Sequence, residues 1–265
     1  MNLTQCAGAW GLVSGASSGI GREFCVQLAA AGMNLVLVAR REAILDEFAD
    51  ELRTRHGIAT RVIAADLARE EAAAEIQARL TREGIAVRLL CNNAAFGRWG
   101  RFEQTEAEVY CEMIRLNTSA MVSLCHRLLP ALSSHPSSVV INVSSPAAYQ
   151  PIPYMAVYAA SKAFVHSFSQ ALYGEWRARG VLVQTLVPGP TDTEFDAKAG
   201  AYDSALKTRA SPAEVVRTAL AHLGQDQPVV AAAKGLFKQR FFAGVFPPRT
   251  VIEQVGRMFR PPEER

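Results

Sequence analysis

Paired cysteines are absent from this 265-residue sequence. It contains five cysteines, an odd number, and no Cys-x-x-Cys pair. Disulfide frameworks need an even number of cysteines and zinc sites need closely spaced ligands, so neither is predicted. We expect five reduced thiols in the core of a cytoplasmic protein that holds no metal.

A long apolar run is absent as well. A membrane-spanning helix needs about 20 consecutive apolar residues, and a secretory signal begins with a basic segment. The N-terminal stretch, MNLTQCAGAWGLVSG, has neither feature and is predicted to lead into a first strand. With 49% hydrophobic and 20% charged residues, the composition is typical of one soluble globular domain.

Most of the chain has no excess of either charge. The net charge is +3, and residues 233–265 alone carry +4, which leaves −1 on residues 1–232. That balance does not fit a nucleic-acid-binding surface. The basic extension also holds several aromatic residues. It is predicted to be a helix docked on its own domain or on a partner subunit, and the alternative is weak contact with a membrane surface or a cover over a lipidic substrate.

The sequence does contain a strand, a glycine-rich turn and a helix in succession. Residues 9–14 are apolar, the turn follows, and a helical pattern extends to about Ala31 before a second strand, Asn34–Ala39. Glycines allow backbone N–H groups to approach a pyrophosphate, and a helix N-terminus presents positive partial charge. This βαβ unit therefore predicts a dinucleotide site. The predicted contacts in the turn are Gly15, Ser17, Ser18, Gly19, Ile20 and Gly21.

No acidic residue stands at the end of the second strand, where NAD-binding proteins hold the ribose hydroxyls. Arg40 and Arg41 follow instead. A guanidinium group matches phosphate geometry with two hydrogen bonds, so the pair predicts NADP(H), with Arg40 as the main contact and Arg41 assisting. The alternative is that both arginines only flank a solvated helix. Farther along, Asp66 and Leu67 follow another strand, and Asp66 is predicted either to bind the adenine amino group or to cap a helix.

Strands and helices alternate along the chain. This alternation predicts a single-domain, Rossmann-like α/β fold, a doubly wound parallel sheet of about seven strands with helices on both faces. Residues 1–232 are predicted to form the catalytic domain and 233–265 an extension of it, and irregular residues 194–210 a mobile lid. Further strands are predicted at Thr60–Ala64, Val87–Cys91, Val139–Val143, Val181–Val187 and Pro228–Ala232, and helices at Glu42–His56, Glu70–Glu83, 106–132, 157–179 and Pro212–Leu223.

Two strand ends offer further cofactor contacts. Small residues after the fourth strand leave room for a ribose against the backbone, and a proline-glycine turn follows the sixth strand, where it would meet the nicotinamide end. The predicted contacts are Asn93, Ala94, Ala95, Pro188, Gly189, Thr191 and Thr193.

Tyr158 and Lys162 are four residues apart near the start of a predicted helix, so they lie on one face. An ammonium group beside a phenol favours the phenolate and lowers its pKa from about 10. Such a pair can give and take a proton in carbonyl chemistry, although alone it is more typical of a solvated helix face. Asn117 lies on an apolar helix stripe and needs partners if it is buried. A local structural hydrogen bond is the alternative to a role in the site.

The chain resembles the short-chain dehydrogenase/reductase family from its start to about residue 232. The family's TGxxxGxG motif matches residues 14–21, with Ser14 for the leading threonine. Its NNAG motif matches residues 92–95, with Ala95 for the glycine, and its PGxxxT motif matches residues 188–193. The finer resemblance is to 3-ketoacyl and 17β-hydroxysteroid reductases.

The family's catalytic residues also have counterparts. Its YxxxK motif matches Tyr158 and Lys162, its catalytic serine falls thirteen residues before the tyrosine on Ser145, and its helix asparagine on Asn117. The resemblance implies that Tyr158 gives a proton to a carbonyl held by Ser145, while Lys162 binds the cofactor ribose and lowers the Tyr158 pKa. Asn117 would hold a water that links Lys162 to solvent. It also implies a homodimer or homotetramer.

Aromatic residues and prolines gather on loops expected at the carboxyl edge of the sheet, where ligands bind. They predict an apolar ketone, an aldehyde or a 3-oxoacyl compound as the substrate. The alternatives are a polyol or sugar alcohol, which needs a more polar pocket, and a catalytically silent NADP(H)-binding regulatory protein. The predicted substrate contacts are Ser145, Ala147, Tyr154, Tyr158 and Phe195. About half of a wider set is expected in the pocket: Phe96, Trp99, Phe102, Tyr149, Pro151, Pro153, Tyr154, Met155, Phe195 and Tyr202.

Overall fold

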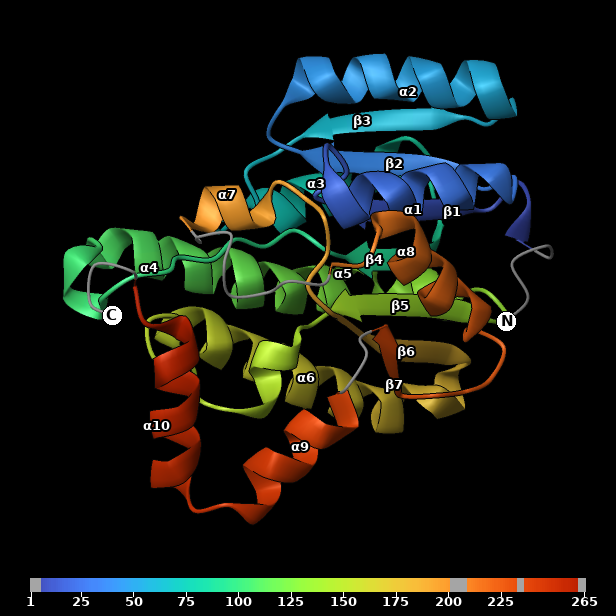
Figure 1. The fold of residues 1–265 in the computed structure, drawn as a ribbon. Helices are drawn as coiled ribbons and strands as arrows, with labels where there is room; N and C mark the ends of the chain where they lie inside the picture. Colours follow the sequence, from blue (N-terminus) through green and yellow to red (C-terminus); the bar gives the residue numbers. More distant parts are fainter. Residues whose placement is uncertain (1–5, 201–208, 233–235, 262–265) are drawn as a thin grey trace.

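The computed structural model describes residues 6–200, 209–232 and 236–261 (Figure 1). At the centre of this part of the chain lies one sheet of seven strands in the order β3-β2-β1-β4-β5-β6-β7. Each neighbouring pair is parallel, which confirms the predicted doubly wound sheet. The strands are β1 (Trp10–Ser14), β2 (Asn34–Ala39), β3 (Thr60–Ala64), β4 (Val87–Asn92), β5 (Ser138–Val143), β6 (Val181–Pro188) and β7 (Val229–Ala232).

The strand order reverses between β1 and β4. The chain builds outward from β1 through β2 to β3 and then returns to place β4 on the other side of β1. In open parallel sheets a reversal of this kind leaves a crevice at the carboxyl ends of the strands, where ligands bind. β5, on the far side of β4, is buried along its whole length and rich in valine and isoleucine, as a central strand covered on both faces should be.

Helices cover both faces of the sheet and bury two separate hydrophobic clusters. One cluster contains Phe24 and Phe48 from α1 and α2, and the other contains Ile76 and Leu124 from α3 and α5. The helices of the first face are α1 (Gly19–Ala30), α2 (Glu42–His56) and α8 (Pro212–Ala221), and those of the second are α3 (Ala72–Arg82), α5 (Ala120–Ser133) and α6 (Ala156–Trp176).

One predicted helix is divided in the structure. Residues 106–132 were expected to be continuous, but α4 (Ala107–Ile114) is joined to α5 by a π-helical turn at Arg115–Ser119. Such turns insert a residue into a helix and occur often at functional sites. The buried Asn117 lies within this turn. Apolar residues continue at helical spacing from α4 into α5, so the sequence pattern did not indicate the π-helical turn between them.

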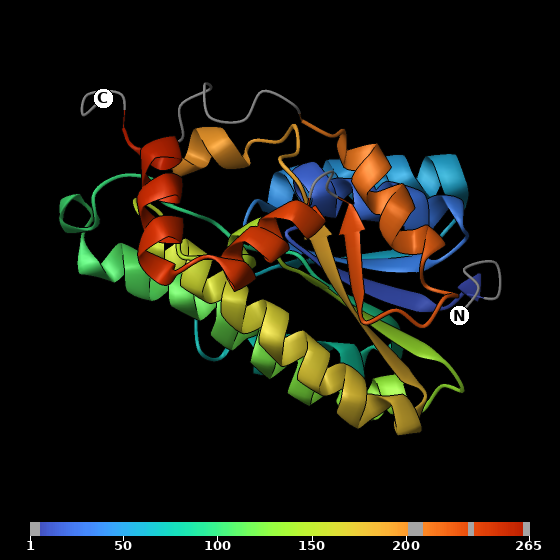
Figure 2. The same cartoon turned by 60° about the horizontal axis from the view of Figure 1, so that its bottom comes forward.

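One segment predicted as irregular is helical in part, and the extension predicted as one docked helix forms two helices. Residues 195–199 of the predicted lid form α7 (Phe195–Ala199), while residues 201–208 lie outside the described part. The C-terminal extension forms a helical hairpin, α9 (Leu236–Val245) and α10 (Pro248–Phe259). Figures 1 and 2 show α7 and α10 beyond the carboxyl ends of the strands, on the side where the crevice opens.

Four of the five cysteines are buried as predicted, but Cys111 is exposed. It lies on α4, whose outer side faces away from the sheet, so a helical position alone did not decide its burial. None of the helices in the described ranges has the length and apolarity to span a membrane.

Candidate active site

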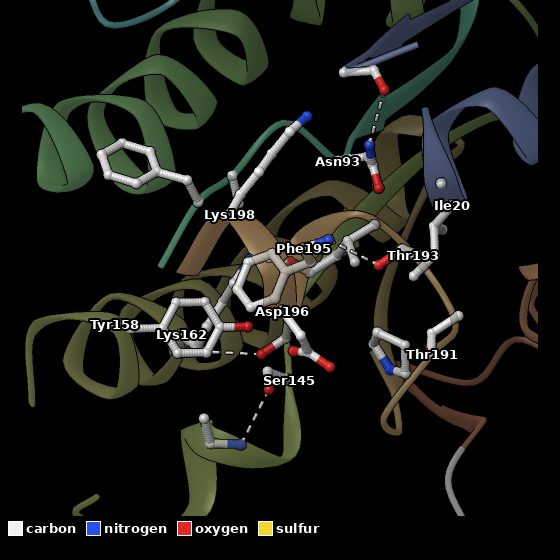
Figure 3. Close-up of a pocket in the computed structure, with 18 of the residues that line it drawn as sticks. Ile20, Asn93, Ser145, Tyr158, Lys162, Thr191, Thr193, Phe195, Asp196 and Lys198 are labelled. Atoms are coloured by element: carbon white, nitrogen blue, oxygen red, sulfur yellow. Dashed lines mark hydrogen bonds between the residues drawn. The ribbon is translucent and has the colours of Figure 1, made fainter. Parts of the chain in front are cut away.

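The three predicted catalytic side chains of β5 and α6 meet at one point. Ser145 lies two residues beyond the end of β5 and caps a short 3-10 helix, Pro146–Tyr149, because its Oγ accepts a hydrogen bond from the Ala147 backbone N–H at 3.2 Å. Tyr158 and Lys162 lie one turn apart on α6 and are both buried. The Ser145 hydroxyl hydrogen-bonds Tyr158. Figure 3 shows Ser145, Tyr158 and Lys162 together at the cavity, with Phe195 close to them.

Burial dominates the proton affinities of this group. Desolvation raises the pKa of Tyr158 to about 12, even though the hydrogen bond with Ser145 lowers it, and the nearby Asp196 carboxylate raises it further. Desolvation also lowers the pKa of Lys162 to about 8. The Lys162 Nζ donates to the Val143 carbonyl at 2.9 Å and lies 5.8 Å from the Tyr158 ring centroid. The expected lowering of the Tyr158 pKa is therefore not found in this structure, because its desolvation is the larger effect.

Asn117 has a structural role through its side chain. Its Oδ1 accepts from the Phe96 N–H at 3.1 Å, and its Nδ2 donates to the Phe96 carbonyl and to Ser161 Oγ, both at 3.0 Å. Ser161 in turn donates to the Tyr158 carbonyl at 2.7 Å. This network ties the loop after β4 to the first turn of α6. Protein groups engage both polar atoms of the side chain, and its Oδ1 keeps a second lone pair beyond the one that accepts from Phe96, so the water-holding role stays a prediction.

The glycine-rich turn forms a cradle that only glycine can build. Gly15 and Gly19 have φ values of 68° and 56°, a region that other residues rarely adopt. A Cβ at Gly21 would lie 2.3 Å from the Gly15 carbonyl oxygen. Asn93 supports the turn, because its Nδ2 donates to the Ser14 carbonyl at 3.0 Å. The backbone thus stays close to the cavity, as the binding of a pyrophosphate requires.

One cavity of about 1100 Å³ joins this cradle to the catalytic group. Nearly all predicted cofactor and substrate contacts line it, from Gly15 to Phe195, and three predicted site residues do not. Gly21 lies buried behind the turn, and Asn117 is held in its own network. Tyr154 has an unusual φ of 66° and lends its carbonyl to the Gly100 N–H, but its side chain is not part of the cavity wall.

The two arginines after β2 both line the cavity but have different partners. Arg40 Nη1 lies 3.6 Å from Glu112 on α4, and its side chain is 67% exposed. Arg41 Nη2 donates to Ser17 Oγ at 3.0 Å and lies 3.6 Å from Glu194. Arg41 is therefore the guanidinium group that touches the glycine-rich turn, and the ranking of the two arginines as phosphate contacts stays a prediction.

Asp66 also lines the cavity, and its Oδ1 accepts from the Ala68 N–H at 3.1 Å. The side chain closes a short turn ahead of α3 and does not cap that helix, which begins at Ala72. A carboxylate held in this way at the cavity wall is consistent with the predicted adenine contact.

An apolar wall faces the catalytic group, and part of it was not predicted. Met155 and Phe195 line the cavity as expected, but so do Ile152 and five residues of the C-terminal hairpin. Four of the hairpin residues are apolar, Phe242, Val255, Met258 and Phe259, and the fifth is Gln254. The aromatic content of the extension was the one sequence signal for them, since nothing in their spacing shows which segment they pack against.

The hairpin is held against the rest of the molecule by specific contacts. The Trp99 indole Nε1 donates to the Phe259 carbonyl at 2.7 Å. Val251 and Val255 are buried in the same cluster as Met155 and Tyr158. A Cβ at Gly256 would lie 3.3 Å from Pro153, which shows how closely α10 approaches the loop before α6.

Some of the predicted aromatic set lies away from the cavity. Phe102 is 62% exposed and stacks on Tyr110, with ring centroids 4.9 Å apart. Tyr149 packs edge-on against His166. Pro151 is exposed, and Tyr202 lies outside the described residues. Of the nine described residues in the set, three line the cavity, Phe96, Met155 and Phe195, which is fewer than the predicted half.

Comparisons with known proteins agree with this site. Residues 10–203 match the family described as short chain dehydrogenase. The chain is 32% identical to 7beta-hydroxysteroid dehydrogenase of Collinsella aerofaciens over 88% of its own length and 90% of that protein. It is 33% identical to the very-long-chain 3-oxoacyl-CoA reductase of Anas platyrhynchos over 68% of its own length, and this match spans only 59% of that longer reductase.

The fold comparison includes a structure with a bound cofactor. The short-chain dehydrogenase of Sphingobium yanoikuyae, solved in complex with NADPH, has a TM-score of 0.80 and 34% identity over 86% of this chain and 88% of that one. The family match and the fold match thus agree. The protein belongs to the short-chain dehydrogenase family, oxidoreductases that interconvert carbonyl and alcohol groups with a nicotinamide cofactor.

Proposed function

We propose that this enzyme uses NADP(H) to reduce an apolar ketone, an aldehyde or a 3-oxoacyl compound to an alcohol, or runs the reverse reaction. The observation that carries the proposal is one cavity in which the glycine cradle, the Ser145–Tyr158–Lys162 group and an apolar wall are continuous. The two similar curated proteins named above also act on lipid-like compounds, a hydroxysteroid and a very-long-chain 3-oxoacyl-CoA.

The preference for NADP(H) is supported by charge. β2 ends without an acidic residue, and two guanidinium groups line the cavity just beyond it. Guanidinium groups suit a 2′-phosphate, whereas a carboxylate would suit the free ribose hydroxyls of NAD(H). The residues that would hold the cofactor are those of the glycine cradle, Arg40 and Arg41, Asp66, and Asn93 to Ala95.

The chain's own groups then perform the proton chemistry. When bound, the cofactor supplies or accepts the hydride. Tyr158, kept protonated by its raised pKa, donates to the carbonyl oxygen, and the Ser145 hydroxyl within hydrogen-bonding reach of it orients that oxygen. Lys162 is fixed by the Val143 carbonyl, so its remaining N–H groups are free to bind ribose hydroxyls and to stabilise the phenolate after proton transfer.

The apolar wall favours a bulky substrate over a sugar. Beside Tyr158 the cavity wall contains Ile152, Met155, Phe195, Val255 and Phe259, side chains that offer no hydrogen bonds to a polyol. The intact catalytic group argues against the other alternative, a silent NADP(H)-binding regulator.

The test is NADPH and NADH oxidation with a matched panel of bulky ketones, aliphatic aldehydes, 3-oxoacyl thioesters and keto sugars. The proposal expects turnover with NADPH and an apolar member of the panel. Turnover confined to keto sugars would support the polyol alternative, and tight NADPH binding without turnover of any member would support the regulatory one.

We also propose a cytoplasmic homodimer or homotetramer with weak membrane contact through the hairpin. Support for the contact comes from large apolar side chains exposed on α9, on α10 and in the turn between them, together with the 91% exposed Arg249. Flotation with anionic vesicles tests it, with Phe246→Glu as the variant expected to stay unbound, and light scattering gives the oligomeric state. The exposed apolar residues are Phe241, Val245, Phe246, Ile252 and Met258.

A further inference from the structure

Each of the two arginines that follow β2 lies beside one carboxylate. The nitrogen–oxygen distance is the same in both pairs. Arg40 faces Glu112 and Arg41 faces Glu194, each at 3.6 Å. They differ in their surroundings. The Arg40 pair lies between β2 and α4 and leaves the arginine side chain 67% exposed, whereas the Arg41 side chain is 40% exposed and rests on the glycine-rich turn.

The Glu194 carboxylate occupies an anion site made by three groups. Lys198 Nζ donates to its Oε2 at 2.5 Å, Arg41 Nη2 lies 3.6 Å from the same oxygen, and the Ser18 hydroxyl hydrogen-bonds the carboxylate. These partners, Lys198 first, hold the pKa of Glu194 below its usual range, so it is ionised at neutral pH. Ser18 belongs to the glycine-rich turn, and Glu194 closely follows the turn after β6. The carboxylate therefore bridges both sides of the nucleotide half of the cavity.

A cofactor phosphate near this turn would need the same donors. A guanidinium group that already faces a carboxylate offers a phosphate less attraction, because the two anions compete for the same N–H groups and repel each other. Arg40 has no contact of this kind with the turn, so a 2′-phosphate held by Arg40 would leave Glu194 in place.

We propose that Arg41 receives the 2′-phosphate and that Glu194 is its internal competitor, a positioning residue that sets the selectivity between NADPH and NADH. Glu194 holds Arg41 against Ser17 while the nucleotide site is free and yields Arg41 when the phosphate arrives. This inference rests on the proposed use of NADP(H).

The experiment measures direct binding to the full chain, not turnover. Dissociation constants of NADPH, NADH, 2′,5′-ADP and ADP are measured by calorimetry for the wild type, Glu194→Gln and Glu112→Gln. Glutamine keeps the size of glutamate and removes its charge. We expect Glu194→Gln to tighten NADPH and 2′,5′-ADP by roughly fivefold, the scale of one partly exposed ion pair, and to leave NADH and ADP within about twofold. Glu112→Gln should leave all four within about twofold.

Other results would overturn the inference. If Glu112→Gln tightens the phosphorylated ligands and Glu194→Gln does not, Arg40 is the phosphate ligand. If Glu194→Gln weakens NADPH, Glu194 organises the site and does not compete in it. A charge-preserving Glu194→Asp should bind like the wild type, and melting temperatures verify that each variant is folded.

The inference and the proposed function fail in different ways. A wild type that binds NADPH tightly, with a Glu194→Gln variant that binds it equally, refutes the role of Glu194 alone. A wild type that prefers NADH and ADP to their phosphorylated counterparts refutes both, because no 2′-phosphate site then exists.

Discussion

The nucleotide end and the substrate end of the cavity are built in different ways. The nucleotide end is centred on one continuous stretch, residues 14–21, in which backbone crowding demands glycine at Gly15 and Gly21. The substrate end collects Ile152, Phe195 and Phe259 from segments far apart in the chain. A site made by local backbone geometry leaves a motif in the sequence, whereas a site made by tertiary packing leaves only scattered apolar residues.

The largest expected effect is on turnover, and it comes from a change at Tyr158, where the two ends of the cavity meet. Tyr158→Phe removes the proton donor and keeps the buried ring, so turnover should fall on the order of a thousandfold. NADPH affinity should stay within about threefold of the wild type, because the cradle lies elsewhere. Steady-state kinetics and calorimetric titration measure the two quantities.

Ser145→Ala serves as the companion variant. It removes a hydroxyl that hydrogen-bonds Tyr158 and should lower turnover less than Tyr158→Phe does. Substantial residual reduction by Tyr158→Phe would show that another group supplies the proton, and the assignment of the site would fail.

The next largest effect is expected when the backbone of the glycine-rich turn is disturbed, because NADPH binding there should depend on the close approach of that backbone. Gly21→Ala would place a Cβ 2.3 Å from the Gly15 carbonyl oxygen, so the turn must move. We expect a loss of about 2–3 kcal/mol in the free energy of unfolding and NADPH binding weakened by roughly a hundredfold. Gly174→Ala on α6 is the control, because nothing lies within 4 Å of its added Cβ. If both variants bind NADPH like the wild type, the cradle is less constrained than its geometry indicates.

The same contrast explains what the sequence could predict. Alternating patterns placed the strands and helices that surround the sheet, and ordered motifs located Ser145, Tyr158, Lys162 and the glycine-rich turn. The π-helical turn at Arg115–Ser119 was missed because apolar spacing continues across it. Spacing also could not rank Arg40 and Arg41, since neighbouring residues find partners, here Glu112 and Glu194, that only the folded chain brings near.

The packing of the C-terminal hairpin was the other feature that the sequence could not predict. The aromatic residues of the extension are visible in the sequence, but the hydrogen bond from Trp99 to the Phe259 carbonyl joins residues 160 positions apart. No local rule predicts a contact of that range. The wall of the substrate pocket therefore had to be found in the structure, and its contribution is the next quantity to measure.

Val255→Ala tests the substrate end with a smaller change. Val255 is buried at the cavity wall, and the loss of two methyl groups should cost about 1 kcal/mol of contact with a bulky substrate. The KM for the best ketone should rise roughly fivefold while NADPH affinity stays unchanged. Ile252→Ala, at an exposed position of the same helix, should change neither. Equal effects on ketone and NADPH would mean that the two ends are not independent.

The smallest effect concerns Lys162, which lies between the two ends. Its pKa is lowered from 10.5 to about 8 by burial, so between these values the unfolded chain binds more protons than the folded one. Stability should therefore rise as pH increases through 8, by about 1 kcal/mol between pH 8 and pH 9. Lys162→Met has no such group and should lack this rise. Urea unfolding of both proteins without cofactor gives the difference directly.

The pH dependence of stability must be compared between the wild type and Lys162→Met, because other buried groups lower the stability as pH rises. Burial raises the pKa of Cys125 to about 12 and that of Tyr158 to about 12, so each loses stability as pH rises above its ordinary value of 9.0 or 10.0. Both groups are present in the wild type and in Lys162→Met, and their contributions cancel. If the two proteins show parallel stability from pH 7 to pH 9, Lys162 is not desolvated as the structure shows, and the cavity at the junction is open to water.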